Sequence, residues 1–159
     1  PNSEATIEDI QSQVTFVNTI NATVDRAHKA IKKIRKINSS LIEFEKNYKG
    51  SKESINLILK SKKLRNQLIK IEKTLYQTQN KSNQDPLNFP IKLTNKLGHL
   101  NSLVTYNDFP PTNQDEEVRI ELTEKVEKQL ETYKSFIEND IKKFNDEFTK
   151  LKIDYLKID

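Results

Sequence analysis

Residues 6–50 read TIEDIQSQVTFVNTINATVDRAHKAIKKIRKINSSLIEFEKNYKG, and this stretch decides the fold of the chain. Its apolar residues recur at steps of mostly three and four, the spacing of one face of an α-helix. They are Ile7, Ile10, Val14, Val17, Ile20, Val24, Ala27, Ile31, Ile34, Leu41 and Tyr48. Thr6 and Asp9 are spaced as a capping box, and Gly50 offers a C-terminal stop. The pattern predicts a long helix over about residues 6–49.

Two further stretches repeat this periodicity. Residues 52–76 can be capped by Ser51 or Ser54 and carry a near-heptad stripe of Leu57, Leu64, Leu68, Ile71 and Leu75, widened by Ile55 and Ile58. Residues 113–156, capped by Thr112 or Asn113, carry Val118, Leu122, Val126, Leu130, Tyr133, Ile137, Ile141, Phe144, Phe148, Leu151 and Tyr155. We expect a shorter helix in the first stretch and a second long helix in the other.

A third, short helix is expected over about residues 91–105, between two proline-bearing segments. Residues 77–90 are polar and aperiodic, so we expect a loop of roughly 14 residues, which is long for a compact domain. Pro90 stands just before the short helix or in its first turn, where its missing N–H costs nothing. Residues 108–111 must end the helix, since they contain two prolines. Its buried face would be Leu93, Leu97, Leu100 and Val104.

Together these elements predict an all-α fold, an elongated antiparallel helical bundle that forms a single domain over residues 1–159. Only two glycines in the whole chain argue against a sandwich or barrel. The helix lengths favour a topology in which the two shorter helices share the return path between the two long ones. A short third helix that doubles back on the second would also fit these lengths.

Charge and composition narrow the function classes. Residues 51–90 carry eight Lys/Arg against three Asp/Glu, whereas residues 115–159 carry nine against thirteen, so the two segments can face each other. The chain has no cysteine, which excludes disulfides and thiol nucleophiles. It has no apolar run long enough for a transmembrane segment and no signal-peptide pattern. Starting at Pro1 without Met, it resembles a processed product or a piece of a longer protein.

No catalytic, cofactor-binding or metal-binding residue is predicted. The basic run of residues 28–36 could neutralise phosphates, but Ile31 and Ile34 keep the core period within it and no aromatic residue interleaves, so we favour a solvated helix face over nucleic-acid binding. His28 and His99 lack a companion at helical metal-site spacing. No phosphate-binding glycine loop or hydrolase motif is present.

The informative stretch is the elbow, residues 84–100, which reads QDPLNFPIKLTNKLGHL. Its two prolines bias the residues before them toward extended backbone, which favours an ordered elbow that fixes the short helix on the bundle. A ligand groove at the elbow is the competing hypothesis. The residues that would form the site are Asp85, Pro86, Leu87, Asn88, Phe89, Pro90, Lys92, Leu93, Asn95, Lys96 and Leu97.

The same stretch resembles the helical C-terminal region of bacterial sortilin-like (VPS10-type), BNR-repeat glycosyl-hydrolase-like proteins. Those proteins end in a segment similar to D-P-L-N-[FY]-P-x-[KR]-L-x-[ND]-[KQ]-L, a P-T-x-Q loop and a long final helix. Residues 6–35 are similar to the helix that follows the family's β-domain. The similarity covers most of the chain in order, and residues 85–97 form its specific block. Asn113 departs from the pattern, and the Ser-Tyr that usually follows is missing.

The resemblance implies a non-catalytic helical accessory or interaction module of a larger exported bacterial protein, whose β-propeller would precede this bundle. It would be periplasmic, outer-membrane-associated or secreted, and its partners would be other domains of the same precursor or a partner protein. The parent family carries a hydrolase label, but this segment offers no residue for it. The alternative is a free-standing, cytoplasmic, chaperone-like or binding bundle that uses a basic or coiled-coil face.

Overall fold

The structure is a computed structural model that describes residues 5–79, 89–106 and 109–151. Within these ranges every regular element is a helix, so the all-α prediction is confirmed. In chain order the elements are α1 (Ile7–Asn47), α2 (Ile55–Leu75), α3 (Leu93–Val104), α4 (Asn113–Phe136), the π-helical turn η2 (Ile137–Ile141) and α5 (Lys142–Lys150).

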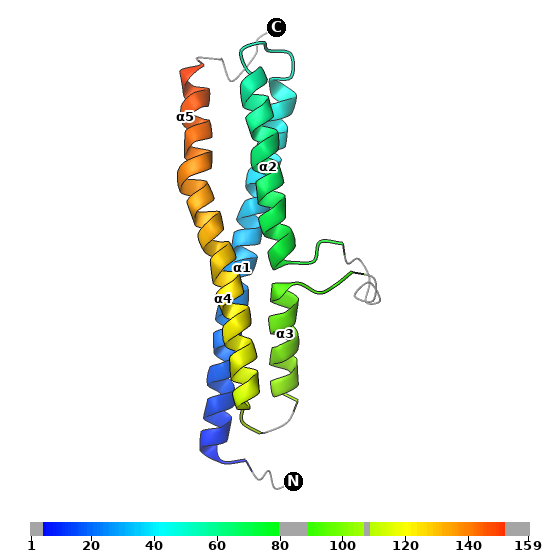
Figure 1. The fold of residues 1–159 in the computed structure, drawn as a ribbon, viewed down its shortest axis with the longest axis vertical. Helices are drawn as coiled ribbons and strands as arrows, with labels where there is room; N and C mark the ends of the chain where they lie inside the picture. The colour runs from blue at the N-terminus through cyan, green and yellow to red at the C-terminus, as the bar shows by residue number, and fades with distance from the viewer. Residues whose placement is uncertain (1–4, 80–88, 107–108, 152–159) are drawn as a thin grey trace.

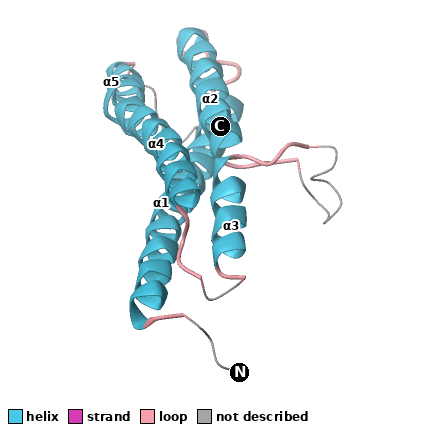
Figure 2. Cartoon of the chain, turned by 60° about the horizontal axis from the view of Figure 1, so that its bottom comes forward, coloured by secondary structure: helices cyan, strands magenta, loops and turns pink. Residues whose placement is uncertain are grey.

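The helices form three rods in an elongated antiparallel bundle (Figure 1). The first rod is α1, which runs nearly the full length of the molecule. The second consists of α2 followed by α3, which continues along the same return path instead of doubling back. The third consists of α4, η2 and α5. Both α2 and α3 contact α1 and α4, and α5 diverges from α2 at the far end, as the tilted view in Figure 2 shows.

The starts of the two long rods have the caps that the sequence predicts. The amide of Asp9 donates to Thr6 Oγ1 at 3.1 Å, and the amide of Thr6 donates to Asp9 Oδ2 at 2.9 Å. Thr112 and Asp115 form the same pair at 3.1 and 2.9 Å, so Thr112 is the cap of α4. The hydrogen bonds from the backbone amide and the side chain of Thr6 lower the pKa of Asp9 below its usual value. Both helices therefore begin where local sequence places them.

The predicted ends between α1 and α2 are wrong in detail. Ser54 is the N-cap of α2, but its side chain does not cap that helix. Its buried hydroxyl instead donates to the carbonyl oxygens of Tyr48 at 2.9 Å and Ser51 at 3.0 Å. Gly50 does not adopt the left-handed conformation of a glycine stop. The hydroxyl of Ser54 thus stabilises the connection between α1 and α2, because it bonds to carbonyl groups that accept no amide of the helical ladder.

One hydrophobic core runs along the bundle and includes residues from α1, α2, α3, α4 and α5. The stripe residues of α1 are buried from Ile20 to Leu41, except for Val24, which is partly buried. Tyr48, directly after the helix, is buried too. Ile7, Ile10 and Val14 are exposed, contrary to the prediction. The reason is geometric: α1 begins beyond the ends of α3 and α4, so its first turns lack neighbours on that face (Figure 1).

The final rod differs from a regular α-helix at η2. Phe136 is buried although the 3.6-residue period selects Ile137, which is only partly buried. The π-helical turn that follows Phe136 contains an extra residue, so it rotates the core-facing positions of α5 relative to those of α4. The last described helical residue is Lys150, and residues 152–156 of the predicted long helix lie outside the described residues.

Candidate functional site

The predicted elbow is described only in part. Asp85, Pro86, Leu87 and Asn88 lie outside the described residues. The remaining elbow residues either precede α3 or form its first turns; these are Phe89, Pro90, Lys92, Leu93, Asn95, Lys96 and Leu97. Leu97 belongs to the core, whereas the adjacent Lys96 is exposed. The elbow therefore contributes both core packing and surface groups.

Two hydrogen bonds join the end of α2 to the start of α3. The buried hydroxyl of Thr94 donates to the carbonyl oxygen of Leu75 at 3.0 Å. The buried amide of Gln77 donates through Nε2 to the carbonyl oxygen of Pro90 at 2.7 Å. Both acceptors are backbone groups at breaks in the helical ladder, where unpaired carbonyls would be costly. The two helices are thereby aligned on one path across the elbow.

Tyr76, directly after α2, contacts two residues of α1. The ring of His28 meets its ring edge to face at a centroid distance of 6.2 Å. The guanidinium of Arg35 lies 5.9 Å from the Tyr76 centroid, a cation–π contact, and its Nε donates to Glu72 at 2.7 Å. Over the described part of the chain, no group of three or more His, Cys, Asp or Glu could hold a metal ion.

Ion pairs tie the rods to one another. Lys60 of α2 pairs with Glu147 of α5, so the basic and acidic segments do face each other there. Arg26 of α1 pairs with Glu127 of α4. Within the basic run of residues 28–36, Arg35 pairs with Glu72 of α2. The run keeps Ile31 and Ile34 in the core, as predicted.

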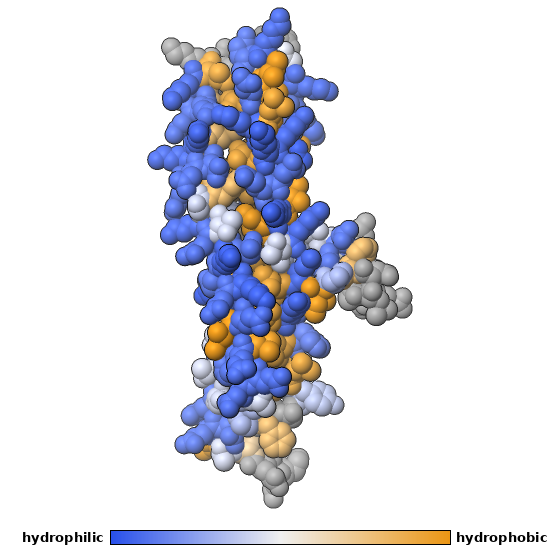
Figure 3. All heavy atoms as spheres, viewed as in Figure 1, coloured by the Kyte–Doolittle hydropathy of each residue, from blue (hydrophilic) through white to orange (hydrophobic). Residues whose placement is uncertain are grey.

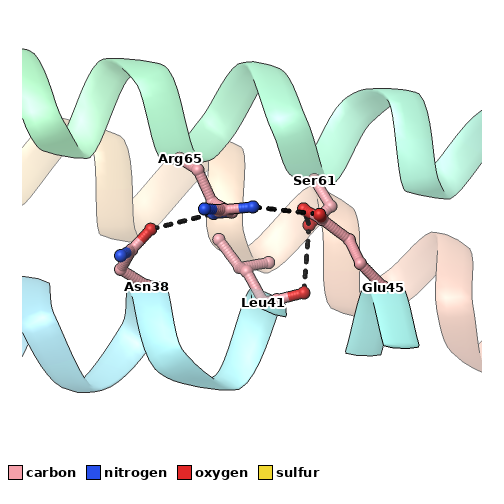
Figure 4. Close-up of polar contacts among 5 residues, drawn as sticks. All are labelled: Asn38, Leu41, Glu45, Ser61 and Arg65. Atoms are coloured by element: carbon pink, nitrogen blue, oxygen red, sulfur yellow. Dashed lines mark hydrogen bonds and ion pairs between the residues drawn. The ribbon is translucent and has the colours of Figure 1, made fainter. Parts of the chain in front are cut away.

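A polar cluster crosses the seam between α1 and α2 (Figure 4). The hydroxyl of fully buried Ser61 donates to Glu45 Oε1 at 2.7 Å. Arg65 donates through Nη1 to Glu45 Oε2 at 3.0 Å and through Nε to Asn38 Oδ1 at 3.1 Å. Sequence reasoning missed this cluster. Its signal was a serine in a core position of α2, where the neighbouring stripe residues are leucines.

Aromatic side chains pack at the end of the bundle where α1 finishes, between α1 and α5. Phe44 meets Phe144 at a centroid distance of 5.2 Å and Phe148 at 5.6 Å, both edge to face. Tyr48 meets Phe148 at 5.5 Å. An open cavity of 430 Å³ lies against this cluster, and Ile37, Leu41 and Ile141 also line it. Edge-to-face rings strengthen packing beyond their buried area.

Large apolar side chains are exposed at the end where α1 and α4 begin and α3 finishes. We call this group the apolar end; it consists of Ile7, Ile10, Val14, Leu103, Tyr106, Phe109, Val118 and Ile120. Gln13 links the elements there, since its Nε2 donates to the carbonyl oxygen of Val104 at 2.8 Å. Hydrophobic residues also appear at the surface along the helix seams in Figure 3. The sequence pattern had assigned several of these residues to the core.

The fold and these features define a class, an elongated three-rod helical bundle with an apolar end. Comparisons with protein families, with curated proteins and with solved structures found no match. In the described ranges, no helix has the length and apolarity needed to cross a membrane. Functional inference therefore rests on the surface of this bundle.

Proposed function

We propose that this chain is a non-catalytic helical interaction module of a larger, exported bacterial protein of the sortilin-like, BNR-repeat type. In this proposal the bundle packs against the β-domains of the same polypeptide or against a partner protein. The resemblance of residues 85–97 to the family's elbow block supports the choice of parent protein.

The observation that carries the proposal is the apolar end. Val14, Leu103 and Tyr106 expose 51%, 56% and 90% of their surface. Single exposed apolar residues are ordinary, but eight of them lie at this one end of the bundle, and we infer from this concentration that the end binds a protein. Burying such residues against a folded partner would gain about 25 cal/mol per Å² of apolar surface. The apolar end is therefore the surface we assign to the partner.

The rest of the bundle suits this role because it holds the apolar end in place. Gln13 ties the start of α1 to the end of α3. The guanidinium of Arg119 in α4 lies 5.7 Å from the centroid of the Phe16 ring in α1. Contacts of this kind fix the three helices before binding, so little side-chain and backbone freedom remains to be lost on association.

Photo-crosslinking in the native protein tests the proposal. A photoreactive residue is placed at Val14 or Leu103, with Leu59 on α2 as the control because its 54% exposure is close to that of Leu103. We expect crosslinks from both positions in the apolar end to one folded domain or partner, and few from Leu59. Equal crosslinking from all three positions would contradict a defined binding surface.

Intact-mass analysis of the native polypeptide tests the choice of parent separately. The proposal expects a polypeptide that contains a β-rich region besides this bundle. A native polypeptide limited to this chain would reject the sortilin-like parent. Crosslinks from the apolar end to a separate protein would then support the alternative, a free-standing helical binding protein.

A further inference from the structure

A basic groove lies where α3 starts beside α4. It has a volume of 460 Å³ and is lined by Thr74, Pro90, Ile91, Lys92, Leu93, Lys96, Lys125, Lys128 and Gln129. All four charged residues among them are lysines, two from the elbow and two from the acidic final rod. The volume is in the range of sites for small molecules. The groove is distinct from the apolar end and from the basic run of residues 28–36.

The spacing of the lysines makes their repulsion a cost to the folded chain. Lys125 and Lys128 are three residues apart, so they lie on one side of α4, whereas Lys92 is the N-cap of α3 and Lys96 lies in its first turn. Like charges at such spacings destabilise a helix. Glu121 offsets part of this charge: it pairs with Lys125, and Lys125 and Lys96 both lower the pKa of Glu121. Four lysines thus line the groove, and one of them pairs with Glu121.

We propose that this groove binds a compact anion with several negative charges on phosphate groups. Lysine ammonium groups act as point charges with three donors each, and they pair well with phosphate oxygens. Thr74 and Gln129 add polar side chains to the wall, while Ile91 and Leu93 give it an apolar part. The ligand is either a free phosphorylated small molecule or the phosphorylated headgroup of a lipid. This binding is independent of the interaction module proposed above.

Calorimetric titration of the full chain with tripolyphosphate, at constant ionic strength, tests the proposal. We expect one ligand per chain and a Kd that rises about tenfold or more in Lys96→Gln/Lys128→Gln, because two charged donors are lost. The matched control is Lys29→Gln/Lys32→Gln, which removes the same charge from exposed positions of α1. The control should bind like the original chain.

A thermal melt without anion checks that the groove variant is folded. Lys96→Gln/Lys128→Gln is expected to keep the Tm, since both lysines are exposed. Absence of binding by the original chain would overturn the proposal. An equal loss of affinity in the groove and control variants would overturn it too, because the binding would then follow net charge.

Vesicles identify the source of the phosphate. Phosphatidylcholine vesicles with phosphatidic acid are sedimented with each variant. Co-sedimentation that is lost only in the groove variant supports a lipid headgroup as the ligand. Groove-dependent tripolyphosphate binding without co-sedimentation supports a free phosphorylated molecule. An oligonucleotide that binds more tightly than tripolyphosphate and is weakened equally in both lysine variants would contradict the groove and favour diffuse nucleic-acid binding.

Discussion

The hydroxyl of Thr94 lies 3.0 Å from the carbonyl oxygen of Leu75 and donates a hydrogen bond to it. Thr94 is in the first turn of α3 and Leu75 is the last residue of α2, and both are buried. This bond joins two helices that are separated in sequence by the elbow. It helps to hold α2 and α3 on one path although residues 76–92 separate the two helices in sequence.

Thr94→Val is expected to lower the free energy of unfolding by about 1–3 kcal/mol, because the carbonyl of Leu75 would be buried without a partner. Urea denaturation followed by circular dichroism measures the loss. The matched control is Thr132→Val, whose exposed hydroxyl bonds only within its own helix, to Lys128. A control that is destabilised as much as Thr94→Val would refute the special role of the junction.

The polar cluster on α1 and α2 should show strong pairwise coupling. A double-mutant cycle with Glu45→Ala and Arg65→Ala is expected to give about 1–3 kcal/mol, because the ion pair is largely shielded and hydrogen-bonded. The same cycle on Lys134 and Glu138, an exposed pair at 4.0 Å, should give about 0.3–0.5 kcal/mol. Equal coupling in the two cycles would be the contrary result.

Packing in the aromatic cluster should dominate the stability of the far end. Phe144→Ala is expected to cost about 3–5 kcal/mol, since it removes a buried ring that meets Phe44 edge to face. Leu59→Ala, a truncation at an exposed position of α2, should change stability by about 0.5 kcal/mol or less. Chemical denaturation of both variants makes the comparison, and a small effect of Phe144→Ala would mean that the cluster is loosely packed.

Acid should weaken the link between α2 and α5. The hydrogen bond from Lys60 lowers the pKa of Glu147 below its ordinary value of 4.5. As the pH falls, the unfolded chain takes up this proton first, so the stabilisation is present above pH 4.5 and is lost as the pH passes through the lower folded value. Lys60→Gln should therefore lower the Tm at about pH 6 and have little effect at about pH 2.

The control for this pH dependence is Lys62→Gln, an exposed lysine of the same helix. Its effect on the Tm should be small at both pH values. If Lys60→Gln lowered the Tm equally at the two pH values, the ion pair with Glu147 would not be the source of its effect.

The sequence predicted the helices well because their signals are local. Thr6 and Asp9 lie three residues apart, so their cap could be recognised without any knowledge of the fold. The exposure of Ile7 could not be predicted in that way, since it depends on where α3 finishes and α4 begins beside α1. The π-helical turn η2 could not be predicted either, since helical periodicity alone assumes regular geometry.

The candidate sites were less accessible to sequence reasoning. Lys92 and Lys96 were recognised as elbow residues, but their proximity to Lys125 and Lys128 follows from the packing of α3 against α4. The sequence shows Ser61 among the leucines of α2, but it does not show that Glu45 of α1 accepts a hydrogen bond from its hydroxyl. In each case the missing information was the pairing of two helices, which a one-dimensional pattern does not contain.

The extra residue in η2 separates the orientation of the last helix from that of α4. In an unbroken α-helix each residue turns by about 100°, so the direction of Leu122 would dictate the direction of Phe144. The π-helical turn changes that relation by a fixed rotation, so the direction of Phe144 depends on η2 as well as on α4. A deletion that turned η2 into regular α-helix would therefore rotate Phe144 away from the core while α4 kept its contacts, so the packing of the last helix depends on this one extra residue.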